Sequence, residues 1–200
     1  MYAYPLDAAD YQDGRTGNAK LGDVVALGNG KFIVIEQGAA PGGKIFNKLM
    51  LVEIGAATDI AAAAFNVTTS DLEKSSMSGA AVNGADWKSV VALKKTQLLD
   101  LNAIGWLAEK AEGLTIVDGN TLALVNDNDF GLKTKVYNAA GVAVDDADVT
   151  KCNVDANGVI ITSSAAGCNA ANTIRVARGD DRERPSRLWL IKFTKALTAF

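Results

Sequence analysis

Short runs of alternating apolar and polar residues recur along most of the chain and predict β-strands. Turn-forming groups separate these runs, among them Gly28-Asn29-Gly30 and Asp118-Gly119, which are typical of antiparallel hairpins. Strands are expected at 24–27, 32–36, 48–54, 90–98, 114–117, 121–125, 133–137, 159–162, 173–178 and 188–193. The pattern therefore predicts an all-β protein of antiparallel strands.

Two segments depart from this alternation. A short helix is predicted over 101–110, because Leu101, Ile104 and Leu107 follow helical spacing and Asp100 precedes them as a candidate N-cap. Residues 70–89 are rich in Ser, Gly and Ala and predict a surface loop.

An internal repeat favours a particular all-β architecture. Residues 23–37 align with 112–126 without a gap, which places Asp23 on Glu112 and Gly30 on Gly119. Each copy has an acidic residue, a strand, a glycine turn, a second strand and a polar end. The shift equals about two blades at the roughly 40–50 residues per blade usual for propellers. We therefore predict propeller-like blades of antiparallel strands, with 1–200 as a single domain.

Composition removes several classes of function. Of the 200 residues 48% are hydrophobic and 22% are charged, and the net charge of −3 leaves no basic footprint for nucleic acid. No apolar run approaches the roughly 18 residues of a transmembrane helix, so we expect neither a nucleic-acid nor a membrane partner. The chain has no histidine, which excludes a Ser-His-Asp triad and a histidine-ligated zinc site. Hydrolysis would have to use carboxylates, Lys, Tyr, Arg or a metal-bound water.

The two cysteines, Cys152 and Cys168, enclose a short span that contains one predicted strand. A disulfide across it would stabilise the fold by about 3 kcal/mol in the chain-entropy account and would indicate an oxidising compartment, periplasmic or extracellular. Two buried free thiols are the alternative. The first residues lack the basic and apolar regions of a signal peptide, so a disulfide would imply a longer precursor. We predict a disulfide-bearing insertion at 142–171.

Candidate chemistry is concentrated at 112–129, where a hairpin ends in Asn126-Asp127-Asn128-Asp129. Carboxylate and amide oxygens are the ligands that calcium prefers. Because the start of one hairpin strand lies beside the end of the other, Glu112 and Asp127 are expected to converge on one ion and to act in catalysis. Asn126 and Asp129 are further candidate ligands. The alternative is that these residues only form a turn.

The repeat supplies two further candidate metal ligands. Asp23 and Glu36 occupy positions in the first copy that correspond to Glu112 and to the polar end of the second copy. In a ring of blades they could line the same central channel, and we therefore include them in the predicted calcium site.

The same segments resemble a known family. Glu112-Gly113-Leu114 with the hairpin and Asn126-Asp127-Asn128-Asp129-Phe130-Gly131 is similar to the phytase-like domain, the esterase-like activity of phytase family. Tyr4-Pro5-Leu6-Asp7, residues 22–36 and residues 188–193 resemble that family in the same order. The resemblance implies a secreted, metal-associated β-propeller that hydrolyses phosphate or carboxylic esters. Members are longer, which implies that this chain is the C-terminal part of a larger propeller; a self-contained four-bladed assembly is the alternative.

Three functions stay open. The first is a calcium-dependent hydrolase of small phosphate esters, in which the ion polarises the ester and a carboxylate orients the attacking water. The second is a non-catalytic propeller whose ion is structural and whose channel mouth binds a ligand or partner. The third is a calcium-dependent lactonase or carboxylic esterase, which rests on analogy of fold.

Overall fold

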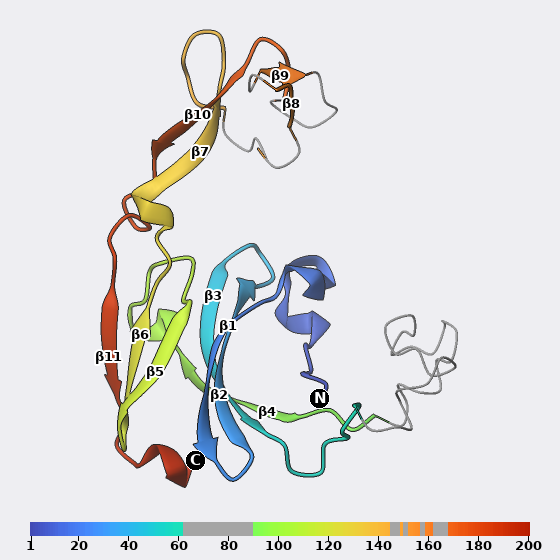
Figure 1. The fold of residues 1–200 in the computed structure, drawn as a ribbon, viewed down its shortest axis with the longest axis vertical. Helices are drawn as coiled ribbons and strands as arrows, with labels where there is room; N and C mark the ends of the chain where they lie inside the picture. Colours follow the sequence, from blue (N-terminus) through green and yellow to red (C-terminus); the bar gives the residue numbers. More distant parts are fainter. Residues whose placement is uncertain (62–89, 145–148, 150–151, 157–158, 162–167) are drawn as a thin grey trace. The chain divides into compact units, whose positions relative to one another are not determined.

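The computed structural model describes residues 1–61, 90–144, 149, 152–156, 159–161 and 168–200 (Figure 1). Their contacts divide the chain into two compact units, the first formed by Met1–Asn126 with Arg187–Phe200 and the second by Asp127–Ser186. Every strand pair in the described residues is antiparallel, so the all-β prediction is confirmed. The predicted loop at 70–89 lies outside the described residues, and the single domain over 1–200 stays a prediction.

A four-stranded sheet forms the larger part of the first unit. Its strands are β1 (Lys20–Gly28), β2 (Lys31–Ala39), β3 (Ile45–Glu53) and β4 (Lys94–Asp100), and they pair in chain order (Figure 1). Asn29 and Gly30 both have positive φ, as the tight turn between β1 and β2 requires. The two central strands are the most buried, because both faces of this sheet are covered.

A three-stranded sheet covers one face. It contains β5 (Gly113–Asp118), β6 (Thr121–Val125) and β11 (Leu188–Lys192) in the order β11-β6-β5. The two segments of the sequence repeat thus form the hairpins β1-β2 and β5-β6. Between the two sheets lies the main core, which includes Ile33, Ile35, Leu49, Trp106, Leu114, Leu122, Leu124 and Ile191. Trp106 and Trp189 meet edge to face, with ring centroids 5.4 Å apart.

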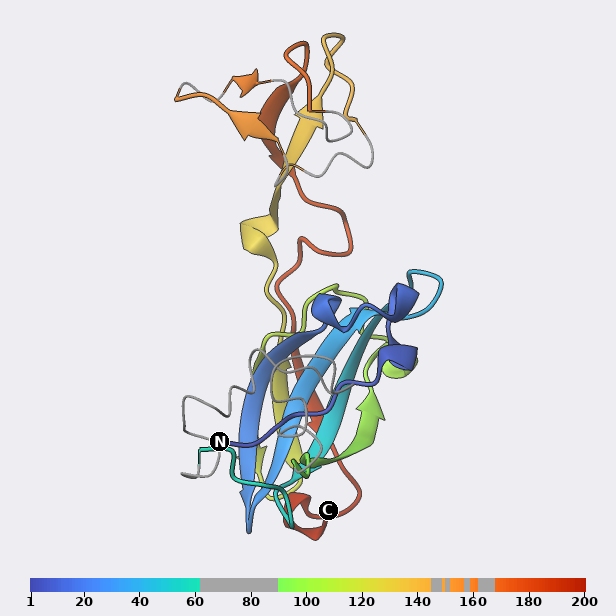
Figure 2. The same ribbon diagram turned by 90° about the vertical axis from the view of Figure 1, so that its right-hand side faces the viewer.

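The N-terminal segment crosses the other face of the four-stranded sheet (Figure 2). It contains three short 3-10 turns, η1 (Ala8–Asp10), η2 (Gln12–Gly14) and η3 (Thr16–Asn18). Beneath it a second apolar cluster forms around Val34, Met50 and Val52, against which Tyr4 packs. Another 3-10 turn, η7 (Leu197–Ala199), follows β11 and buries Leu197 in the main core.

The predicted helix over 101–110 is wrong. The segment contains a single 3-10 turn, η4 (Asn102–Ile104), which ends at Gly105 with φ of 99°. Asp100 does accept hydrogen bonds from the amides of Asn102 and Ala103, as an N-terminal cap would. Ile104 and Leu107 are exposed, so their helical spacing does not mark a buried face.

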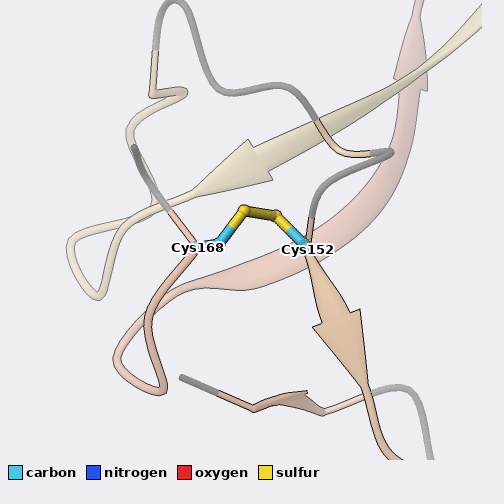
Figure 3. Close-up of a disulfide and its surroundings, with 2 residues drawn as sticks. All are labelled: Cys152 and Cys168. Carbon is cyan, nitrogen blue, oxygen red and sulfur yellow. A yellow bond between two sulfur atoms is a disulfide. The ribbon is translucent and has the colours of Figure 1, made fainter. Parts of the chain in front are cut away.

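The second unit contains two small antiparallel pairs. The strands β7 (Leu132–Tyr137) and β10 (Thr173–Arg178) form one pair, and β8 (Asn153–Val154) and β9 (Ile160–Ile161) form the other. The 3-10 turn η5 (Asp129–Gly131) precedes β7. Cys152 and Cys168 are joined in a disulfide, which confirms the predicted bridge (Figure 3). The predicted insertion at 142–171 falls within this unit.

The described strands form no closed ring of blades, so the propeller stays a prediction. In the part of the chain that the structure describes, no helix has the length and hydrophobicity needed to cross a lipid bilayer.

Candidate functional site at the end of the first sheet

Two buried amide side chains fix the loop that precedes β5 against the end of the four-stranded sheet. Gln37, near the end of β2, accepts a hydrogen bond from the Ala111 amide at 2.9 Å. Asn47, its cross-strand neighbour on β3, donates to the Ala108 carbonyl at 3.3 Å. Both side chains are almost fully buried. Because buried amides need partners, these bonds hold the loop in one position.

Gly22 on β1 allows the same loop to approach the sheet. A Cβ atom at this position would lie 2.7 Å from the Ala111 carbonyl oxygen and 3.1 Å from the Cβ of Ile35. Real side chains do not make contacts as short as the first of these. The loop therefore packs directly on the backbone of β1.

The loop carries Glu112 to the end of the first hairpin. Gln37 Nε2 donates to Glu112 Oε1 at 3.4 Å, and the Glu112 amide donates to the Val125 carbonyl at 3.0 Å. The Glu112 side chain is otherwise exposed to solvent. The polar end of one repeat copy thus lies beside the acidic residue that begins the other.

An open groove of about 380 Å³ lies next to this pair. It is lined by residues 17–20 and 37–39 together with Ile45 and Glu109. Lys20 Nζ lies 3.8 Å from Glu109 Oε1, and about half of each of the two side chains is exposed. The groove therefore offers a positive charge, a carboxylate and a buried amide within a small volume.

Glu36 lies on the opposite face of the sheet from Gln37, because successive residues of a strand point to opposite faces. Its side chain is 1% exposed and accepts hydrogen bonds from the Tyr4 hydroxyl at 2.6 Å, the Tyr11 hydroxyl at 2.9 Å and Lys95 Nζ at 2.8 Å. The structure does not place Glu36 beside Glu112. It makes Glu36 the anchor of the N-terminal segment.

The contacts of Glu36 keep it ionised. Burial alone acts to raise the pKa of its carboxyl, but the hydrogen bonds from Lys95, Tyr4 and Tyr11 outweigh burial, so the pKa lies below its ordinary value. Burial and the neighbouring carboxylate raise the pKa of Tyr4 and of Tyr11 well above the ordinary tyrosine value. At neutral pH the cluster is an ion pair flanked by two neutral hydroxyls.

Two other predicted ligands have structural contacts. Asp23 accepts the Val24 amide at 2.8 Å through one oxygen and the Leu114 amide at 3.0 Å through the other, which connects β1 to β5. Asn126 accepts the Arg187 amide at 2.7 Å and so connects the end of β6 to the start of β11.

Asp127 and Asp129 belong to the second unit. Asp127 accepts the Asp129 amide at 3.0 Å, and Asp129 has φ of 48° at the start of η5. The convergence of Glu112 with Asp127 and Asp129 stays a prediction. Across the described residues, no three acidic, histidine or cysteine side chains gather into a metal-binding cluster. The oxygens of 126–129 and of Glu112 are nevertheless the kind that a hard cation takes.

Comparison with known families gives one result. The family model described as Phytase-like, esterase-like activity of phytase, matches residues 1–130. The chain belongs to this family. The match includes both sheets of the first unit except β11, and it contains Gln37, Glu112 and the groove. Membership in the phytase-like family supports a phosphoesterase-like hydrolase in general. Searches of curated proteins and of solved structures gave no match.

Sequence reasoning did not find Lys20 or Glu109 as site residues, nor Tyr4 and Tyr11 as partners of Glu36. No local pattern marks them, since Lys20 and Glu109 meet only when the loop before β5 folds back onto β1. The sequence does contain a signal for Gln37, because Glu36 and Gln37 are polar residues that directly follow the apolar run 32–35.

Proposed function

We propose that this protein is a calcium-dependent hydrolase of small phosphate esters and that Glu112, at the end of the first sheet, belongs to its site. Family membership over 1–130 supports the reaction class. The observation that carries the location is the Gln37–Glu112 contact at 3.4 Å beside a groove with a lysine in its wall. Glu112 and Asp127 are the proposed catalytic carboxylates.

The proposed calcium ligands are Glu112, Asp127 and Asp129. A bound calcium ion would polarise the ester and activate water. Asp23, Glu36 and Asn126 are left out of this set, since every side-chain oxygen of these three residues already binds a partner described above.

The architecture and the compartment are part of the same proposal. A four-stranded antiparallel sheet in chain order, covered by a second antiparallel sheet, supports adjacent blades of a larger propeller. The disulfide supports an oxidising compartment, periplasmic or extracellular, since such bridges persist there.

A paired-substrate assay tests the reaction. The chain is incubated with p-nitrophenyl phosphate or p-nitrophenyl acetate, with calcium or with a chelator. We expect calcium-dependent release from the phosphate ester, reduced on the order of a hundredfold in Glu112→Gln and in Asp127→Asn. Glu53→Gln is the matched control, since Glu53 is also a strand carboxylate but pairs with Lys94 on β4.

Three results would count against the proposal. Equal rates in Glu112→Gln and the wild type would remove Glu112 from the site. Hydrolysis of the acetate ester alone would favour a carboxylic esterase. A chelator that lowers the melting temperature of a chain inactive on both substrates would favour a structural ion.

A further inference from the structure

The groove beside Gln37 has little positive charge. Among the described side chains that line it, Lys20 is the cation and Glu109 the anion. A neighbouring groove of about 270 Å³ shares Ile45, and its charged lining residues are Lys44, Lys48, Asp10 and Asp100. The formal charges cancel in each groove. A substrate with several phosphates would therefore find too few cations to balance it.

Lys20 is placed to bind one anionic group. Its ammonium lies 3.8 Å from Glu109, which is longer than a hydrogen-bonded ion pair, and its side chain is 54% exposed. Such an exposed pair contributes little stability, so a phosphate can replace the carboxylate at the ammonium at small cost. Glu109 would then lie close to the bound phosphate and would repel every anionic group on the ligand, so the repulsion increases with the number of phosphates while Lys20 can balance only one of them.

The size of the groove agrees with a small ligand. A volume of about 380 Å³ falls at the lower end of the range for small-molecule sites. Gln37 forms part of its wall and contacts Glu112, which places the groove next to the proposed catalytic carboxylate.

We propose that this groove is the substrate-binding site of the proposed hydrolase and that it selects esters with a single phosphate over polyphosphorylated ones. Lys20 binds the phosphate, and Glu109 excludes further anionic groups. The inference rests on the proposed function for its reaction, but the binding step can be measured without turnover.

Calorimetric titration in the presence of a chelator tests the binding step. The probes are phenylphosphonate, whose carbon–phosphorus bond is not an ester, and inositol hexakisphosphate. We expect phenylphosphonate to bind the wild type more tightly than the hexakisphosphate does. Lys20→Ala should weaken phenylphosphonate binding about tenfold, the effect of losing one charge-assisted hydrogen bond. Glu109→Gln should strengthen hexakisphosphate binding by about tenfold, because it removes a like charge.

The matched control is Lys94→Ala. Lys94 also pairs with a glutamate and lies on the same sheet, but it does not line either groove. Its replacement should leave both affinities unchanged. Lys20 and Glu109 are exposed, so all three variants should keep the wild-type melting temperature, which separates a binding effect from unfolding.

The outcomes separate this inference from the proposed function. Tighter binding of the hexakisphosphate by the wild type, or unchanged phenylphosphonate affinity in Lys20→Ala, would overturn the inference even if Glu112 proves essential for hydrolysis. The expected binding pattern in a chain that hydrolyses no ester would support the groove and would overturn the proposed function.

Discussion

Replacing Glu36 with Gln is the strongest test of how the N-terminal segment is held. The substitution keeps the size of the side chain but removes a buried negative charge that accepts three hydrogen bonds, from Tyr4, Tyr11 and Lys95. Hydrogen bonds to a charged group contribute about 1.5–3 kcal/mol each. Removing one partner of a buried ion pair costs about 3–5 kcal/mol, because the other charge stays behind. Since Lys95 keeps some access to water, we expect a loss of about 3 kcal/mol.

Urea denaturation followed by tryptophan fluorescence measures this loss, since Trp106 and Trp189 lie in the core of the first unit. The midpoint should fall while the slope stays constant, which shows that the native state is lost at lower denaturant without a change in compactness. Glu53→Gln is the control, because Glu53 also pairs with a lysine of β4 but is more exposed. A loss below about 1 kcal/mol in Glu36→Gln, or an equal loss in the control, would refute the reasoning.

The pH dependence of the same variant provides a second measurement. The pKa of Glu36 is lowered in the folded state, so in acid the unfolded chain takes up the proton first. The stability that Glu36 contributes is therefore present above the ordinary glutamate value of about 4.3 and is lost as the pH falls through the lowered folded value. We expect the wild-type and Glu36→Gln curves to approach each other in acid. Curves that stay parallel down to low pH would contradict the ionised state of Glu36.

Three further predictions follow from other contacts. The pKa values of Tyr4 and Tyr11, which donate to Glu36, are raised in the folded state, so the stability of the first unit should fall as the pH rises above about 10. Replacing both tyrosines with Phe should remove this fall. An unchanged loss of stability at alkaline pH in that variant would contradict the prediction. Gly22→Ala should destabilise the first unit by about 2 kcal/mol, because its Cβ would meet the Ala111 carbonyl. Gly119→Ala is the control and should cost little stability, because Gly119 has open space around it. Equal urea midpoints for the two variants would count against the close approach at Gly22. Replacing both cysteines with serine should lower the stability of the second unit by about 3 kcal/mol. The unfolding of the first unit, followed by tryptophan fluorescence, should be unchanged. A shift in that unfolding transition would show that the bridge also stabilises the first unit.

Much of the fold follows from local sequence signals. Alternation and turn chemistry predicted β1-β2 and β5-β6, because a hairpin needs only neighbouring residues and a tight turn between them. The turn of the second hairpin lies at Gly119-Asn120, one residue later than predicted. The predicted helix over 101–110 does not form, because the backbone of this loop makes hydrogen bonds with the buried side chains of Asn47 and Gln37, which lie far away in the sequence. Helix propensity depends on neighbouring residues alone and does not account for hydrogen bonds from distant strands.

Less of the candidate site could be predicted. The repeat placed Asp23 and Glu36 with Glu112 as candidate ligands, whereas the side chain that contacts Glu112 from the first hairpin is Gln37, which was not among them. Strand periodicity already separates Glu36 from Gln37, so the two could not face one site. The partners of Glu36 could not be predicted, because Tyr4 and Tyr11 reach it through irregular backbone that has no period.

The repeat also explains why one of two corresponding acids is the better candidate for chemistry. Asp23 and Glu112 begin equivalent hairpins, but both oxygens of Asp23 accept backbone amides, one of them from β5. A metal or substrate at Asp23 would have to break the connection between the two sheets. The side chain of Glu112 is longer by one carbon, and among the described residues its contact is the hydrogen bond of 3.4 Å from Gln37. It can therefore turn toward a ligand while the bond from its amide to Val125 on β6 keeps its backbone in place. The same hairpin, used twice, thus supplies a structural carboxylate in the first copy and an adaptable one beside the groove in the second.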